Sequence, residues 1–340
     1  MQNQINSLAA LLTAGLSQKA KVNTDWTQAD WSVLLPFLEK NRLTTIALRG
    51  LTQYKDNGLP MPDKDVYKTI SSQAMSMNLE NIALHANMLT LARKWEAEDK
   101  RPLALGGMAF ASYYPNARLH YANEFECVAV YKEGCEKGEA AATSFKVGQL
   151  NIKVVDTATG PFANKNCEHE DAVLRQAFLA GPCALDRNTL VAYPNLNFRA
   201  LYLLYTARQQ LLHSYLPIGK VLDWAMVIRR VGAMQANIFS WELFLEQLND
   251  LGLFPFAQSF TALAVRLTGV EMPALGASLL ADNPDTDYLY QCIVDEAAAH
   301  TDGDSRFSRF IGALRNKKKY EQFSELSPTK QAFRYLFGKD

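Results

Sequence analysis

The chain lacks a net charge, a paired-cysteine motif and a long apolar run, and each absence argues against a class of protein. Its 340 residues hold 35 Lys and Arg against 35 Asp and Glu, so no overall field attracts nucleic acid. The five cysteines form no Cys-x-x-Cys pair, which argues against structural zinc and a disulfide framework and is typical of a reducing compartment. No uncharged apolar run reaches the roughly 20 residues of a membrane span, and no basic segment followed by a long apolar one marks a signal peptide. We therefore expect a soluble, cytoplasmic protein with no membrane partner.

Helical periodicity dominates both ends of the chain, including most of the first sixty residues. The longest predicted helix runs from about Asp63 to Glu98, because Pro62 and Pro102 break the pattern on either side. Within it, apolar residues recur at alternating steps of four and three, which gives one continuous apolar stripe. The stripe consists of Met75, Leu79, Ile82, Ala86 and Leu89. After Pro194 we predict helices at 201–213, 221–231, 241–251, 256–267, 288–299, 305–323 and 328–337.

Strand signals are confined to the middle of the chain, in short segments rich in apolar or β-branched residues. These segments are 103–105, 125–131, 149–155, 183–185 and 190–193. Because long helical regions flank them, the sequence predicts an α+β fold in which a small mixed sheet is embedded in a mainly helical protein.

The most informative stretch is 103–130, where two of these strands flank a glycine turn. The first strand runs into Gly106-Gly107, a helical turn follows, and the second strand opens with Glu124 and Glu126. Residues two apart on a strand share a face, so these carboxylates can converge on one cation while Phe125 faces the core. Nucleotidyl transfer uses such carboxylates to hold two Mg²⁺ ions about 3.5–4 Å apart. Glycines let backbone N–H groups approach a triphosphate. A solvated strand face and an ordinary turn would show the same residues.

The order and spacing of these residues resemble a family of uncharacterised bacterial nucleotidyltransferases with the fold of the DNA polymerase beta superfamily. In that family a strand leads to a Lys-Gly or Gly-Gly turn, then Ala-Leu-Ala, Tyr-Pro, an Arg and the metal-binding Asp-x-Asp. The corresponding residues here are Gly106-Gly107, Ala109-Phe110-Ala111, Tyr114-Pro115 and Glu124-Phe125-Glu126.

The resemblance covers the whole chain. Its most distinctive later match is Asp223-Trp224-Ala225, within a segment similar to the family's Gly-Leu-Arg-x-x-x-Asp-Trp-Ala helix. We accordingly predict three regions: an N-terminal helical region at 1–62, a nucleotidyltransferase-like α/β core at 63–195 and a C-terminal helical domain at 196–340.

The chain departs from the family at several functional positions. Glutamates replace the two aspartates, His120 replaces the Arg before them, and Lys153 replaces a third acidic residue on the next strand. Thr206 and Gln210 stand where the family has histidines, and Gly219-Lys220 displaces an Arg near Asp223. A lysine pairs well with carboxylates. Our hypothesis is that Lys153 takes the place of a metal and neutralises Glu124 and Glu126. With a shifted register, Asn151 or Asp156 would face the site instead.

The resemblance implies a catalytic set and a nucleotide site. Glu124 and Glu126 would hold Mg²⁺, with Lys153 beside them as the third member of the catalytic set. An NTP, as substrate or ligand, would lie against Gly106, Gly107, His120, Lys220 and Asp223. The implied reaction is transfer of a nucleoside monophosphate to an unknown acceptor.

Four alternatives remain open. The scaffold can be a catalytically inactive nucleotide-binding or protein-interaction module. His120 can be a partly buried surface residue. Asp223 can be a residue near a helix N-terminus that offsets local charge, with Trp224 in the core. A plain helical scaffold with an accidental resemblance is excluded only if the strands after 102, 124 and 149 pair in one sheet.

Overall fold

The computed structural model describes residues 2–17, 25–122, 124–131, 144–147, 150–154, 168–213, 216–233, 238–280, 285–296 and 317–323. The α-helices are α1 (Gln2–Leu16), α2 (Trp31–Lys40), α3 (Thr44–Asp56), α4 (Lys64–Ala97), α5 (Glu168–Leu179), α6 (Leu196–His213), α7 (Ile218–Gly232), α8 (Trp241–Asp250), α9 (Phe254–Thr268), α10 (Thr286–Glu296) and α12 (Lys317–Phe323). The strands are β1 (Lys100–Ala104), β2 (Glu124–Tyr131), β3 (Ser144–Val147), β4 (Leu150–Val154), β5 (Ala184–Asp186) and β6 (Val191–Tyr193). Short 3₁₀ helices are η1 (Asp25–Gln28), η2 (Gly107–Tyr113), η3 (Ala117–Leu119) and η5 (Ala274–Leu279).

The strands form one mixed sheet in the order β3-β4-β2-β1-β6-β5. β1 runs antiparallel to β2 and parallel to β6, and β2 runs parallel to β4. All five predicted strand segments belong to this sheet, and β3 is a sixth strand that the sequence did not predict. The predicted α+β class, a small mixed sheet in a mainly helical protein, is confirmed.

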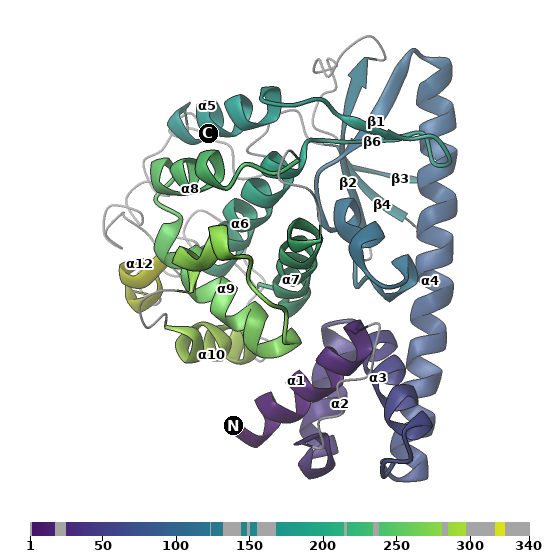
Figure 1. Cartoon of the computed structure of the whole chain (residues 1–340). Helices are drawn as coiled ribbons and strands as arrows, with labels where there is room; N and C mark the ends of the chain where they lie inside the picture. Colours follow the sequence, from purple (N-terminus) through teal and green to yellow (C-terminus); the bar gives the residue numbers. More distant parts are fainter. Residues whose placement is uncertain are drawn as a thin grey trace.

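Helices cover the sheet and extend well beyond it. α4 packs across β1, β2, β4 and β6, so the sheet lies between α4 and the C-terminal helices (Figure 1). The N-terminal helices pack on the other half of α4 through α2 and α3, and α1 also contacts α9. The core is therefore continuous from the N-terminal helices through the sheet to the C-terminal helices.

The ends of α4 follow from local chemistry. The Asp63 side chain accepts hydrogen bonds from the backbone N–H groups of Asp65 and Val66, which caps the first turn. At the other end Asp99 has a left-handed φ of 63°, which turns the chain from the helix into β1. The predicted helix from about Asp63 to Glu98 is confirmed.

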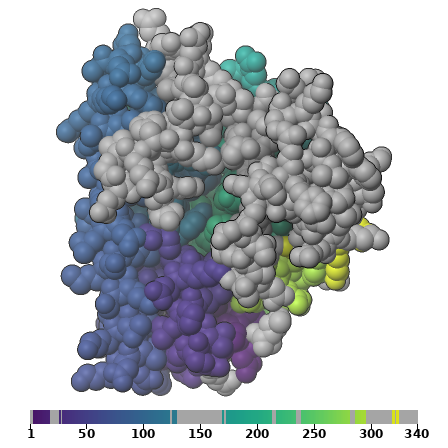
Figure 2. All heavy atoms as spheres, turned by 180° about the vertical axis from the view of Figure 1, so that it is seen from behind, coloured from purple at the N-terminus to yellow at the C-terminus, as the bar shows by residue number. Residues whose placement is uncertain are grey.

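The predicted apolar stripe on α4 is not the buried face of this helix. Met75, Leu79 and Ile82 are 66%, 59% and 44% exposed. The buried face consists of Ile70, Ala74, Met77, Asn81, Leu84, Met88 and Leu91. This second stripe repeats at the same alternating steps of four and three. It is less apolar in sequence because one of its members is an asparagine. The outer face of α4 forms one long edge of the molecule (Figure 2).

The cysteines depart from the sequence expectation at one position. Cys183 is disulfide-bonded, whereas Cys127 and Cys292 are buried free thiols. The absence of a Cys-x-x-Cys pair therefore did not exclude a disulfide. Within the described ranges, no helix is long and apolar enough to cross a bilayer. The predicted helix at 328–337 lies outside the described residues.

The two faces of α4 allow a matched test of the core assignment. Leu84→Ala removes a side chain that is 3% exposed, so we expect it to lower the free energy of unfolding by about 2–5 kcal/mol. Leu79→Ala removes an exposed leucine from the same helix and should change it by no more than about 0.5 kcal/mol. Urea unfolding of both variants measures the difference. Equal losses would contradict the assigned buried face.

Candidate functional site

The turn Gly106-Gly107 follows the end of β1, and side chains of neighbouring segments pack against both glycines. The Leu105 N–H donates to the Glu126 carbonyl at 3.0 Å, which holds the turn against the start of β2. A Cβ at Gly106 would lie 2.8 Å from Glu126 Oε2. A Cβ at Gly107 would lie 3.1 Å from His120 Cε1. The space that the missing Cβ atoms leave is therefore taken by Glu126 and His120.

Glu126 is half-buried and has a hydrogen-bond donor on α6. The Tyr202 hydroxyl donates to Glu126 Oε1 at 3.1 Å. Burial, and after it the neighbouring Glu126 carboxylate, hold the pKa of Tyr202 well above its ordinary value. Tyr202 therefore stays protonated and remains a donor at neutral pH.

The strand register settles which residues neighbour the glutamates along the backbone. In the parallel pair of β2 and β4, Glu126 is paired with Lys153 and Glu124 with Asn151. Paired residues of parallel strands share a face, so these four positions lie on one face of the sheet. The side chains of Glu124 and Lys153, and all of Asp156, lie outside the described part of the chain.

The neighbours of Glu126 bear on the predicted magnesium site at the start of β2. Among the described residues, no group of three or more His, Cys, Asp or Glu side chains is placed to share a metal ion. One oxygen of Glu126 accepts from Tyr202, and the other occupies the space beside Gly106. Both oxygens of Glu126 therefore have neighbours within the protein.

Asp223 on α7 is the centre of a second group, which we call the carboxylate cluster: Asp223, Tyr114, His120 and Tyr121. The exposed fraction of Asp223 is 0%. Its Oδ1 accepts from the Tyr114 hydroxyl at 2.8 Å and lies 3.0 Å from His120 Nε2, while Oδ2 accepts from the Tyr121 hydroxyl at 3.1 Å. Burial, followed by the charge of Asp223, holds the pKa of Tyr114 well above its ordinary value. Both tyrosines contribute protons that solvate a buried carboxylate.

The geometry fixes the protonation of the His120 ring. The Ala122 backbone N–H donates to His120 Nδ1 at 3.1 Å, so Nδ1 carries no proton. Nε2 then carries the proton and donates it to Asp223. His120 is neutral in this arrangement, and both of its nitrogens are engaged. It is 1% exposed, so the interpretation as a partly buried surface residue is wrong.

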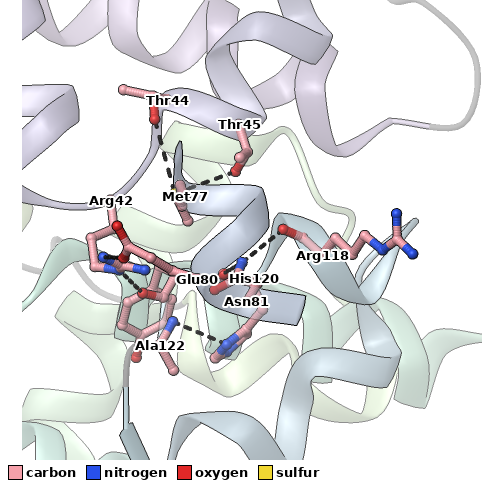
Figure 3. A network of polar contacts seen from close by, with 10 residues as sticks. Arg42, Thr44, Thr45, Met77, Glu80, Asn81, Arg118, His120 and Ala122 are labelled. Carbon is pink, nitrogen blue, oxygen red and sulfur yellow. Dashed lines mark hydrogen bonds and ion pairs between the residues drawn. The ribbon is translucent and has the colours of Figure 1, made fainter. Parts of the chain in front are cut away.

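The loop that carries His120 is anchored from α4 (Figure 3). Asn81 Nδ2 donates to the carbonyls of Arg118 and His120, each at 2.9 Å. Arg42 Nε donates to the Tyr121 carbonyl at 2.8 Å, and its guanidinium forms an ion pair with Glu80. These bonds explain why an asparagine occupies a buried position of α4.

α7 approaches the same loop at a glycine. A Cβ at Gly219 would lie 2.4 Å from the Tyr121 ring, closer than a side chain can pack. The next residue, Lys220, donates from Nζ to Thr206 Oγ1 on α6 at 2.9 Å. Trp224 is fully buried, and its Nε1 donates to Thr261 Oγ1 at 2.8 Å. This position agrees with the interpretation of Trp224 as a core residue.

The structure thus brings most of the predicted site residues together around the glycine turn. Gly106 contacts Glu126, and Gly107 contacts His120, which is bonded to Asp223. Lys220 lies on the same helix as Asp223 but is bonded to α6. The sequence did not predict Tyr202 or Tyr121 as neighbours of this site. It also did not predict Arg199 and Arg230, which both lie over the Tyr113 ring. In sequence these residues look like any other tyrosine or arginine. Only their three-dimensional contacts single them out.

In comparisons with protein-family models, curated proteins and solved structures, the chain has no match.

The carboxylate cluster predicts a large stability effect from one side chain. Asp223→Ala removes the acceptor of three buried donors, each of which costs about 1–3 kcal/mol when left unsatisfied. We expect the free energy of unfolding in urea to fall by at least ~3 kcal/mol. The control is Asp287→Ala, which removes an exposed partner of Arg266 and should cost less than about 1 kcal/mol. Similar losses in the two variants would contradict the role of Asp223.

Proposed function

We propose that this chain is a nucleotide-binding protein on a nucleotidyltransferase-like scaffold that no longer performs metal-dependent nucleotidyl transfer. The observation that carries the proposal is the state of Glu126. Its carboxylate accepts from Tyr202, is packed on Gly106 and has Lys153 as its register neighbour. A positive or hydrogen-bond-donating partner satisfies a carboxylate in place of a metal ion.

The strand arrangement supports the scaffold. β1 leads into the glycine turn, β2 carries the two glutamates, and β4 carries the lysine at the position of the family's third acidic residue. These strands are neighbours in the order β4-β2-β1. An accidental resemblance on a plain helical scaffold would not require these three segments to pair in one sheet.

The test is a thermal-shift screen of the four common NTPs with the full chain, in Mg²⁺ and in EDTA. A ligand that binds the native state stabilises it by RT ln(1 + [L]/Kd), so bound nucleotide raises the melting temperature with concentration. We expect at least one NTP to give the same shift in Mg²⁺ and in EDTA. Glu126→Gln should leave that shift unchanged, as should the control Glu98→Gln at an exposed position.

Two results would contradict the proposal. A shift that needs Mg²⁺ and disappears in Glu126→Gln would show that the carboxylate holds a metal. If none of the four nucleotides changes the melting temperature, the proposed nucleotide binding is wrong.

A further inference from the structure

Two arginines lie against the same tyrosine ring beside the glycine turn. Arg199 Cζ is 5.1 Å from the centroid of Tyr113 and 5.8 Å from that of Tyr193. Arg230 Cζ is 5.7 Å from the centroid of Tyr113. We call Tyr113, Tyr193, Arg199 and Arg230 the arginine–tyrosine site. Its residues come from η2, the end of β6, the first turn of α6 and the last turn of α7.

The positive charge of this site has no carboxylate partner among the described residues. The ion pairs within that part of the chain involve neither Arg199 nor Arg230. Arg199 donates from a terminal nitrogen to the Ala109 carbonyl at 3.0 Å, which is a neutral acceptor. Its Nε is buried and has no hydrogen-bond partner among the described residues. A buried donor without a partner is costly, and an anion that reached it would remove that cost.

The surroundings add positive charge. Arg229, beside Arg230, donates to the carbonyls of Tyr113 and Leu16, and it belongs to none of the ion pairs among the described residues. The C-terminal dipole of α7 offsets part of the charge of Arg229 and Arg230. Arg199 has no such offset, because it lies in the first turn of α6, where the dipole favours an anion. Burial lowers the pKa of Arg199, and its neighbours Tyr113 and Tyr193 offset part of that shift.

The position of the site connects it to Glu126. Arg199 and Tyr202 are three residues apart on α6 and therefore share a face of that helix. Tyr202 contacts Glu126, and Arg199 contacts Ala109 of η2, which directly follows the glycine turn. Tyr193 ends β6, which is parallel to β1, so the site lies at the carboxyl end of two neighbouring parallel strands. Ligands of sheets with parallel strands commonly bind at this end.

We propose that the arginine–tyrosine site binds the phosphate groups of a ligand, with Arg199 and Arg230 as the charged donors. Guanidinium groups bind phosphate oxygens through paired hydrogen bonds and favour positions over aromatic rings, where both arginines lie here. Tyr113 adds a hydroxyl donor, since burial raises the pKa of its hydroxyl above the ordinary value. The assignment rests on the proposed function only in naming a nucleotide as the source of the phosphates.

The test uses inorganic tripolyphosphate as the probe and isothermal titration calorimetry on the full chain at fixed salt. We expect wild type to bind it, and Arg230→Gln to weaken binding by about tenfold, the effect of losing one charge-assisted contact. Arg230 is exposed, so this variant keeps the fold. Arg199→Gln should weaken binding further. Arg266→Gln, which removes an arginine paired with Asp287, is the control and should bind like wild type.

The outcomes separate this proposal from nucleotide binding. If wild type does not bind tripolyphosphate, or if Arg230→Gln binds it as tightly as wild type, the phosphate site is wrong. If NTPs shift the melting temperature equally in wild type and in Arg230→Gln, nucleotide binding stands and the phosphate site is wrong. If tripolyphosphate binding depends on Arg230 while no NTP binds, the phosphate site stands and the proposed function is wrong.

Discussion

The buried carboxylate of Asp223 is the constraint on which the rest of this edge depends. A fully buried charge is tolerated only when hydrogen bonds replace its water, and here Tyr114, Tyr121 and His120 supply them. All three donors come from one loop between β1 and β2, so a single side chain on α7 fixes that loop to the C-terminal helices. Asn81 of α4 binds the same loop through the His120 carbonyl, and the Ala122 N–H donates to the His120 ring within the loop. The position of the glycine turn, which packs on His120, follows from this arrangement.

The polar groups nearest the turn are satisfied within the protein: Glu126 by Tyr202, and His120 by Asp223 and a backbone amide. A site that exchanges ligands needs groups that are not satisfied in this way. Arg199 has such a group in its buried Nε, and its charge is matched by no described carboxylate. Arg199 lies one helical turn from Tyr202, the donor to Glu126, so the proposed phosphate site lies close to this carboxylate.

The sequence predicted the parts of the fold that local chemistry controls. Two prolines bounded the longest helix, and short apolar or β-branched runs located five strands, because both signals act over a few residues. The face of α4 could not be read in this way, since two stripes share one period and tertiary packing selects between them. Asn81 made the buried stripe look less apolar, and only its bonds to the loop explain it. Likewise, Lys153 was placed beside the glutamates by resemblance, and the register pairs it with Glu126. Contacts such as Tyr114 with Asp223, 109 positions apart, leave no trace in spacing.

The most direct test of the central constraint is the tautomer of His120, measured by long-range ¹⁵N–¹H correlation on histidine-labelled protein at neutral pH. If Asp223 accepts from Nε2 while the Ala122 amide donates to Nδ1, the spectrum will show a neutral ring with its proton on Nε2. A proton on Nδ1, or a ring protonated at both nitrogens, would contradict the account, because the Ala122 amide would then have no acceptor and the loop would not be held by Asp223 as described.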